Sequence, residues 1–407
     1  MATAQPRPSI EVADILRLYG EEYRCTHNPS EKQRAVMRHI LSCRTASLGG
    51  HKDTCDTCGH VRHSYNSCRD RHCPKCQNLK KAEWLEGRRK RLLPTNYFHV
   101  VFTLPSQLRP FALQNKRLLY DLLFRTAAET IQTLAKDKKR LGAQVGFTAI
   151  LHSWTQSLLM HPHLHCVVTG GGLSEEGSRW VKGSADYFLP KAVMGAMFRG
   201  KFLFALKQAY EAGRLRLHGS LEKYRSRSAW KKLLNRLYDL KWVVYAKRPF
   251  GGAEQVFRYL GRYTHRVAIS NHRLVELKEG QVYFQVRDRK AEGKKKTIHL
   301  DALEFVRRFL LHVLPGQFTR IRHYGLLAGR NIKTKFARAC ELLREMGQEA
   351  PAPMDEGEKE ESPLPWWERL LQLTGIDVMA CPVCGEGRFR LEALPASGMA
   401  VANHSPP

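Results

Sequence analysis

The chain has 407 residues, with 67 Lys and Arg against 38 Asp and Glu, so its formal net charge is +29. Hydrophobic residues make up 43% and charged residues 26%, as in ordinary globular proteins, which excludes a chain that is disordered throughout. The length predicts two or three domains, and the excess of positive charge indicates a polyanionic partner, nucleic acid before an anionic membrane.

Neither a membrane segment nor an export signal is expected. A spanning helix needs about 20 apolar residues, and the longest candidates, such as 97–104, are far shorter. The first residues lack a basic start followed by an apolar run, so we expect no secretory signal. We therefore expect a cytoplasmic protein, in which eleven cysteines favour metal binding over disulfides.

Helices and strands alternate irregularly along the chain, without strict βαβ order, which favours an α+β fold. The first 45 residues are expected to be helical, with Ser30 as an N-cap. Further helices are predicted at 78–93, 110–141, 190–216, 219–239, 253–265 and 302–314. Strands are predicted at 97–105, 146–154, 163–171, 241–250 and 266–270, before a hairpin over 272–288 that turns near Glu279–Gly280. A Pro- and acid-rich linker follows at 350–365, and a CPVC sequence at 381–384.

Two CxxC pairs, separated by 14 residues, predict a structural zinc site held by Cys55, Cys58, Cys73 and Cys76. Each pair places two thiolates on one side of a tight turn, and two such turns complete a tetrahedron. Zinc would supply folding energy to a segment too short and polar to fold alone. Several neighbours are candidates to replace a ligand or to build a second site, or are simply polar loop residues: His51, His63, Cys68 and His72.

A basic helix follows the cysteines. Taken alone it is either a solvated face or a phosphate-binding surface, and the net charge of +29 favours phosphate contact. Its candidate DNA-binding residues are Lys80, Lys81, Arg88, Arg89 and Arg91, with Lys90 beside them.

The strand around HPHLHCVV, residues 161–168, carries a candidate metal pair. Alternate side chains of a strand share a face, so His163 and His165 point the same way. Two imidazoles at the start of an apolar strand suit a metal, although an HxH pair alone is a weak signal. The first choice for a third ligand is His152 and the second is His161, with a non-ligand role open for either.

Two tyrosines, Tyr259 and Tyr263, are spaced to share one face of the helix predicted at 253–265. Aromatic residues at this spacing usually belong to a core. Here three arginines interleave with them, and Gly261 in mid-helix suits the close approach of a DNA backbone. The arginines are Arg258, Arg262 and Arg266, which we predict to bind DNA.

A metal pair and a tyrosine helix together suit one chemistry. The metal polarises a phosphate, and a tyrosine hydroxyl attacks the phosphorus to give a 5′-phosphotyrosine and a free 3′-OH. The covalent bond stores the phosphodiester energy, so that rejoining needs no nucleotide cofactor.

The chain resembles the two-tyrosine HUH transposases of insertion-sequence family ninety-one, over roughly residues 30 to 345. The resemblance rests on several segments in the family's order: NSCRDRHCPKC (66–76), FHVVFTLP (98–105), HPHLHCVV (161–168), FRYLGRYTHRVAIS (257–270) and RIRHYGLLAGRN (320–331). It implies a rolling-circle transposase that cleaves and rejoins single-stranded DNA at transposon ends in the bacterial cytoplasm, near the nucleoid.

The same resemblance implies a role for each matching residue. His163 and His165 match the metal pair for Mg²⁺ or Mn²⁺, Tyr259 and Tyr263 the nucleophiles, and the CxxC cysteines the zinc-binding domain. The implied fold is an HUH-nuclease-like antiparallel sheet, generally of five strands, flanked by helices and preceded by a helical, zinc-binding N-terminal domain.

Three domains are predicted: 1–94 for the helices and zinc-binding domain, 95–345 for the catalytic domain, and 346–407 for the linker and tail. The CPVC tail lies outside the resemblance, and no nearby cysteine pair was identified to complete a zinc site with it. Two alternatives stay open: an HUH replication initiator with the same chemistry, and a non-catalytic zinc-containing nucleic-acid binding protein whose tyrosines only stack bases. The oligomeric state is not predicted.

Overall fold

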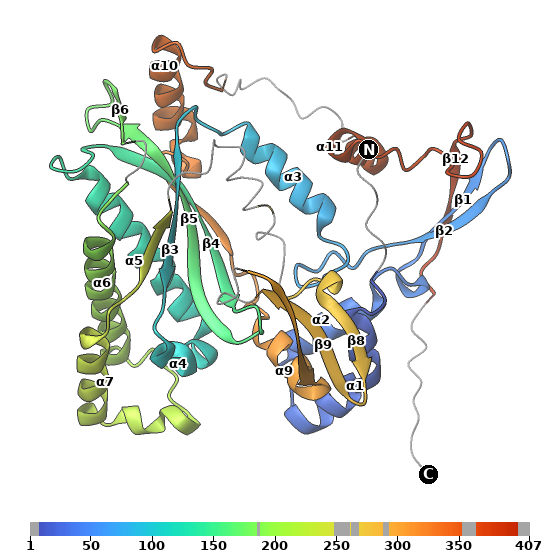
Figure 1. The fold of residues 1–407 in the computed structure, drawn as a ribbon, viewed down its shortest axis with the longest axis horizontal. Helices are drawn as coiled ribbons and strands as arrows, with labels where there is room; N and C mark the ends of the chain where they lie inside the picture. Colours follow the sequence, from blue (N-terminus) through green and yellow to red (C-terminus); the bar gives the residue numbers. More distant parts are fainter. Residues whose placement is uncertain are drawn as a thin grey trace. The chain divides into compact units, whose positions relative to one another are not determined.

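The computed structural model describes residues 8–184, 188–247, 261, 268–287, 293–351 and 364–397. The chain forms two compact units, each assembled from separate stretches of sequence (Figure 1). The first unit comprises Met1–Glu86, His265–Val313 and Gly357–Pro407, and the second comprises Gly87–Thr264 and Leu314–Glu356.

The first unit combines helices with two small antiparallel sheets, in the strand orders β12-β1-β2 and β10-β9-β8. Its strands are β1 (Gly50–Cys55), β2 (Val61–Tyr65), β8 (Leu274–Lys278), β9 (Gln281–Arg287), β10 (Lys295–Asp301) and β12 (Phe389–Leu394). Its helices are α1 (Val12–His27), α2 (Glu31–Ser42), α9 (Ala302–Leu311) and α11 (Trp366–Thr374), while α3 (Asn78–Arg89) runs across the boundary between the units.

Helix α2 begins where the sequence predicts. The Ser30 hydroxyl accepts a hydrogen bond from the Gln33 backbone N–H at 3.4 Å, and the Gln33 side chain accepts one from the Ser30 N–H at 2.9 Å. This reciprocal pair satisfies two backbone donors that a helix N-terminus otherwise leaves without partners. The predicted N-cap is confirmed.

Two late segments of the chain fold with the N-terminal residues, unlike the consecutive domains drawn from the sequence. Helix α1 packs on α9, and its Val12 N–H donates to the Asn271 side chain at 3.2 Å. Strand β12 pairs with β1 along its whole length. Backbone pairing between distant segments leaves little trace in the local sequence, and the simple division at residues 94 and 345 therefore differs from the units of the structure.

The predicted hairpin over 272–288 is confirmed by β8 and β9, which are joined at Glu279 and Gly280. Both turn residues have positive φ, 51° and 73°, as a two-residue turn between antiparallel strands requires. The strand predicted at 266–270 was wrong for its described part: residues 268–270 form no strand, and Ala268 has a φ of 54°, which breaks an extended backbone.

The second unit is built on a six-stranded sheet in which every pairing is antiparallel. Five strands follow the order β11-β4-β5-β3-β7, and β6 pairs with the far end of β5. The strands are β3 (Tyr97–Thr103), β4 (Gln144–Trp154), β5 (Met160–Leu173), β6 (Trp180–Lys182), β7 (Val244–Lys247) and β11 (Ile321–Gly325). The predicted α+β class, with an antiparallel sheet flanked by helices, is confirmed.

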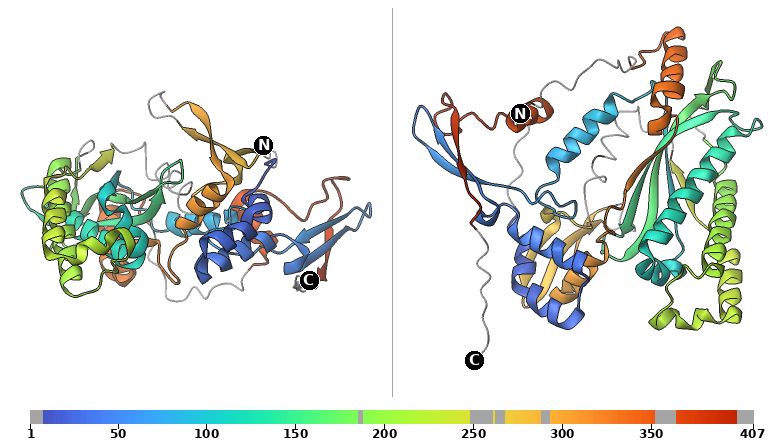
Figure 2. Two further views of the ribbon diagram at one scale, coloured as in Figure 1. Left: turned by 90° about the horizontal axis from the view of Figure 1, so that it is seen from below. Right: turned by 180° about the vertical axis from the view of Figure 1, so that it is seen from behind.

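Helices α5 (Lys116–Lys136) and α6 (Lys191–Glu211) cover one face of this sheet (Figures 1 and 2). Apolar side chains from every second strand position form the core beneath them, among them Phe147 and Leu151 of β4 and Leu164 of β5. Among the described residues of this unit, the other α-helices are α4 (Arg109–Gln114), α7 (Arg227–Asp239) and α10 (Ala337–Glu345). In the part of the chain that the structure describes, no helix has the length and apolar character needed to cross a bilayer.

The segment RIRHYGLLAGRN contains the edge strand β11 and the turn that closes it. Gly325 ends β11 with a φ of 60°, and a Cβ placed there would overlap the Val145 carbonyl oxygen. The turn is held by the Asn331 side chain, which donates to the Gly325 carbonyl at 2.7 Å. Leu326 and Leu327 then enter a separate buried cluster. Much of this motif is therefore explained by the closure of the sheet edge.

Replacing Gly325 with Ala should destabilise the second unit by at least about 2 kcal/mol, because the left-handed backbone and the overlap with Val145 both oppose a methyl group. Gly200→Ala in α6 is the matched control: a Cβ at Gly200 has no atom within 4 Å and should stabilise the helix by about 0.5–1 kcal/mol. Thermal unfolding of both variants checks this, and equal melting temperatures would contradict it.

Candidate functional site

Three histidines meet on the sheet face opposite α5 and α6. His152 of β4 lies directly across from His163 of β5 in the strand register, and His165 follows two residues later. Paired and alternate residues of antiparallel strands share a face. The ligand nitrogens of all three imidazoles lie within 4.8 Å of one another, and His161 is not part of this group.

Hydrogen bonds orient two of these rings. The His163 Nδ1 lies 2.6 Å from the His161 carbonyl oxygen, which only accepts, so Nδ1 carries the proton and a metal would bind through Nε2. The His165 Nδ1 lies 2.8 Å from Nε2 of His99, so a metal would again bind His165 through Nε2. Such outer hydrogen bonds commonly fix the orientation of histidine ligands.

His99 is a fourth member of this arrangement, and the sequence analysis gave it no role. It comes from β3, its side chain is 4% exposed, and its ring stacks on that of His165 with centroids 5.1 Å apart. The signal was present, since His99 occupies an alternate position of a buried strand. Only the pairing of β3 with β5 shows that it reaches His165.

The histidine site favours neutral imidazoles. Burial lowers the pKa of His165 well below its ordinary value, and the neighbouring His152, His163 and His99 lower it further. Neutral imidazole is the form that ligates a metal. Three nitrogen donors on one face suit a divalent cation that keeps further positions for other ligands.

The tyrosines predicted as nucleophiles, Tyr259 and Tyr263, lie outside the described residues. The same holds for the three arginines predicted to bind DNA beside them, which are Arg258, Arg262 and Arg266.

The prediction of one zinc site from Cys55, Cys58, Cys73 and Cys76 was wrong in its grouping. The structure forms two groups of four thiols, each with its ligand atoms within 4.8 Å. One group is Cys43, Cys68, Cys73 and Cys76, and the other is Cys55, Cys58, Cys381 and Cys384.

The reason for this split is the hairpin of β1 and β2. Cys55 ends β1 and Cys58 lies in the connection to β2, whereas Cys68 follows the opposite end of the hairpin. A strand of five residues spans roughly 16 Å, which is too far for one metal. Each half of the predicted site therefore finds its partners elsewhere, in Cys43 or in the CPVC tail.

The first group is compact and close to the basic helix α3. The Cys68 and Cys76 sulfurs are 3.7 Å apart. Hydrogen bonds with the Cys68 and Cys73 thiols lower the pKa of Cys43 to about 7. His72, a candidate ligand, instead forms a hydrogen bond to Asp70 through its Nδ1 at 2.9 Å. This bond explains why a histidine is buried next to the thiols without being one of the four ligands.

The basic residues of α3 and the turn after it differ in their surroundings. Lys80 and Arg89 are exposed, and Lys81 and Arg91 are half-buried. Arg88 is also half-buried, and its guanidinium donates to Nε2 of His323 at 3.1 Å. Arg88 thus has an internal partner, which makes it a weaker candidate for phosphate contact than the exposed Lys80.

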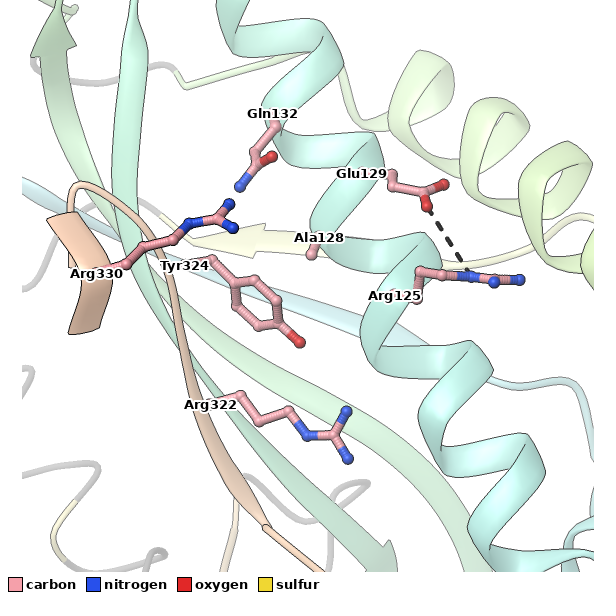
Figure 3. Close-up of a pocket in the computed structure, with 7 residues that line it drawn as sticks. All are labelled: Arg125, Ala128, Glu129, Gln132, Arg322, Tyr324 and Arg330. Carbon is pink, nitrogen blue, oxygen red and sulfur yellow. Dashed lines mark ion pairs between the residues drawn. The ribbon is translucent and has the colours of Figure 1, made fainter. Parts of the chain in front are cut away.

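A shallow pocket between α5 and β11 opens on the helix-covered side of the sheet, away from the histidines (Figure 3). The Tyr324 ring points toward α5, and Arg330 and Gln132 extend toward one another. Arg322 bonds Asp121 at 2.5 Å and packs over the Phe124 ring. The lining of this pocket is basic, with Arg125, Arg322 and Arg330 against Glu129.

Two known protein families match this chain, each over a different range of residues. A family described as "Transposase zinc-binding domain" matches residues 15–104, and one described as "Putative transposase" matches residues 146–335. The protein named "Putative transposase y4qJ" of Sinorhizobium fredii is 49% identical over 384 residues, which cover 94% of this chain and 95% of the relative. The chain belongs to the IS91 family of transposases.

A second relative supports this family assignment. The protein named "Transposase for insertion sequence element IS801" of Pseudomonas savastanoi pv. phaseolicola is 28% identical, over 89% of this chain and 83% of the relative. No solved structure matches the chain. The histidines on β4 and β5 lie within the segment that matches the transposase family, and the first thiol group lies within the zinc-binding domain.

We expect His323 to make the stability of this IS91-family transposase depend on pH. Arg88 donates to its Nε2, so the proton sits on Nδ1, which donates to the Thr148 hydroxyl at 2.9 Å. Burial, with the charges of Arg88 and Arg91, lowers the pKa of His323 to about 4. A histidine in the unfolded chain has a pKa of about 6.5. Between pH 4 and pH 6.5 the unfolded chain therefore binds a proton that the folded protein does not. The contribution of His323 to the free energy of unfolding is therefore fully present above pH 6.5 and is lost as the pH falls toward 4.

His323→Gln should flatten that pH dependence by up to about 3 kcal/mol between pH 7 and pH 4, because the replacement does not titrate. Denaturant unfolding at several pH values measures the effect. The exposed His218, changed to Gln, is the control and should leave the slope as in the wild type. Parallel profiles for the wild type and His323→Gln would contradict the prediction.

Proposed function

We propose that this transposase cleaves and rejoins single-stranded DNA at the ends of its element through a 5′-phosphotyrosine intermediate. The observation that carries the proposal is the convergence of His152, His163 and His165 on one face of the sheet, with His99 bonded behind them. This face lies in the segment that matches the transposase family.

Tyr259 and Tyr263 are the proposed nucleophiles. Their i, i+4 spacing places them on one face if the segment is helical. The tyrosine hydroxyl gives up its proton as its oxygen attacks the phosphorus, the bond from phosphorus to the 3′ oxygen breaks, and the 3′ oxygen takes up a proton to become a free hydroxyl. In the reverse step a 3′-OH attacks the phosphotyrosine and restores the tyrosine, so no external energy source is needed. Two tyrosines allow a second cleavage before the first link is resolved.

The three histidines would hold the catalytic divalent cation, proposed as Mg²⁺ or Mn²⁺. When bound, the metal polarises the scissile phosphate and neutralises its developing charge. An all-nitrogen protein ligand set favours Mn²⁺ of the two, because Mg²⁺ takes oxygen ligands. His99 acts as a positioning residue, since its hydrogen bond orients the His165 ring toward the other two histidines.

Structural zinc is proposed for Cys43, Cys68, Cys73 and Cys76, the thiol group that lies wholly within the matched zinc-binding domain. This site would stabilise the segment from which α3 starts. Lys80 and Arg89, the exposed basic residues of α3, are the best placed to contact DNA phosphates.

Tyr259→Phe and Tyr263→Phe test the nucleophiles. The wild type, given labelled single-stranded DNA from the flanks of its own gene and Mn²⁺, should form an adduct that survives denaturation and maps to a tyrosine. The double variant should lose this adduct by at least about a thousandfold, because the attacking oxygen is gone, while DNA binding persists. Tyr238→Phe is the matched control, since this exposed tyrosine of α7 should leave the yield unchanged.

The outcomes separate the alternatives. No adduct with any variant, but intact DNA binding, would support a non-catalytic protein whose tyrosines stack bases. Cleavage that persists in the double variant would instead indicate hydrolysis by metal-activated water. Either result would overturn the proposal.

The histidines predict a graded dependence on metal. His163→Ala should abolish cleavage at any Mn²⁺ concentration tested, because it removes a ligand. His99→Asn should keep the ligands but raise the Mn²⁺ concentration for half-maximal cleavage roughly 10- to 100-fold, as the loss of an orienting hydrogen bond does. A Mn²⁺ titration of adduct formation measures both, and a wild-type titration curve for His99→Asn would contradict the positioning role.

A further inference from the structure

The C-terminal CPVC segment is built into the N-terminal sheet. Strand β12 pairs antiparallel with β1 in a continuous register, from Gly50 opposite Leu394 to Cys55 opposite Phe389 (Figure 2). This register carries the CPVC turn to the end of the sheet where the first CxxC pair lies. Two chain segments 329 residues apart thus present their cysteines to one another.

Four thiols meet there with the spacing of a metal site. The Cys55 and Cys384 sulfurs are 3.7 Å apart, and so are those of Cys58 and Cys381. A tetrahedron with Zn–S bonds of about 2.3 Å has edges of about 3.8 Å. A disulfide bond is about 2.05 Å long, so these thiols are placed as ligands and are not bonded to each other.

The two turns have the same local structure. Each reads Cys-x-x-Cys-Gly, and Gly59 and Gly385 have φ values of 70° and 75°. In each turn the glycine N–H donates to the carbonyl of the first cysteine, at 3.2 Å and 3.1 Å. Backbone amides also reach the sulfurs: the Cys58 N–H donates to Cys55 at 3.5 Å and the Gly387 N–H to Cys384 at 3.3 Å. Such donors favour thiolate, the form that binds zinc.

Close approach of the two segments is also specified by glycine. A Cβ at Gly387 would overlap the Cys55 sulfur, so only glycine lets the tail backbone reach that position. Next to it, the Asp56 N–H donates to the Arg388 carbonyl at 3.0 Å, and the Arg388 N–H donates to the Asp56 carboxylate at 2.9 Å.

The apolar contact around these thiols is small. Its buried residues are two of the cysteines, Met379 and Phe389, with Arg62 stacked over the Phe389 ring at 3.8 Å. Such a cluster supplies little burial to hold a chain end in place, and small domains of this kind commonly depend on a metal.

We propose that Cys55, Cys58, Cys381 and Cys384 bind a second Zn²⁺ ion that fastens residues 364–397 to the N-terminal zinc-binding domain. The ion closes a loop that contains the whole catalytic segment, and the two chain ends then form one zinc-bound, three-stranded sheet. The family match for the zinc-binding domain ends at residue 104 and contains only half of these ligands.

Zinc content of the full-length protein tests this site. Elemental analysis of the purified protein by mass spectrometry should find two Zn²⁺ per chain in the wild type and one in the Cys381→Ser, Cys384→Ser double variant. Cys25→Ser, which changes an exposed cysteine outside both groups, is the control and should retain two. One Zn²⁺ in the wild type, or two in the double variant, would overturn the proposal.

A second measurement needs no variant and therefore does not depend on whether the double variant folds. Alkylation of the wild type with iodoacetamide, read by peptide mass spectrometry, should modify the exposed Cys25 at once but spare the equally exposed Cys58. After zinc is removed with a chelator, Cys58, Cys381 and Cys384 should react together. Modification of Cys58 in the zinc-loaded protein as fast as that of Cys25 would overturn the proposal, whatever the outcome of the cleavage assays.

Discussion

The register between β4 and β5 is the constraint on which the histidine site depends. His152 faces His163 across the two strands, while Leu151 and Leu164 are paired on the opposite face. A slip of one residue would turn the imidazoles into the core and expose the leucines. The core beneath α5 and α6 therefore fixes the register, and burial of apolar side chains on one face determines where the polar ones converge on the other.

The buried polar groups of this face are matched to one another through hydrogen bonds. A carbonyl orients His163 and a second histidine orients His165. At the edge strand β11, Arg88 can only donate, which keeps His323 neutral. An unmatched imidazole in such surroundings would cost free energy. These hydrogen bonds link β3, β4, β5 and β11 into one preorganised polar surface.

The first unit is stabilised differently from the second. Its β1–β2–β12 sheet is small, and the thiol groups stand where a larger domain would have a hydrophobic core. The hairpin separates the two CxxC pairs by its own length, and each pair is completed by distant cysteines. The first unit takes its residues from the beginning, the middle and the end of the chain. The segments of the two units therefore alternate along the sequence.

The sequence by itself determined the local features of this transposase. Ser30 predicted the start of α2, runs of β-favouring residues predicted β3, β4 and β5, and the turn near Glu279–Gly280 predicted the β8–β9 hairpin. The spacing within HPHLHCVV placed His163 and His165 on one face, since strand geometry repeats every two residues. These features depend on neighbours in the chain, and local pattern is sufficient for them.

Only the tertiary structure decided which distant residues meet. Cys58 and Cys73 are 15 positions apart yet belong to different thiol groups, while Cys55 and Cys384 are neighbours across 329 positions. His99 reaches His165 because β3 pairs with β5. These contacts depend on which strand edges join, and that is settled by the packing of the whole unit, to which sequence separation is a poor guide.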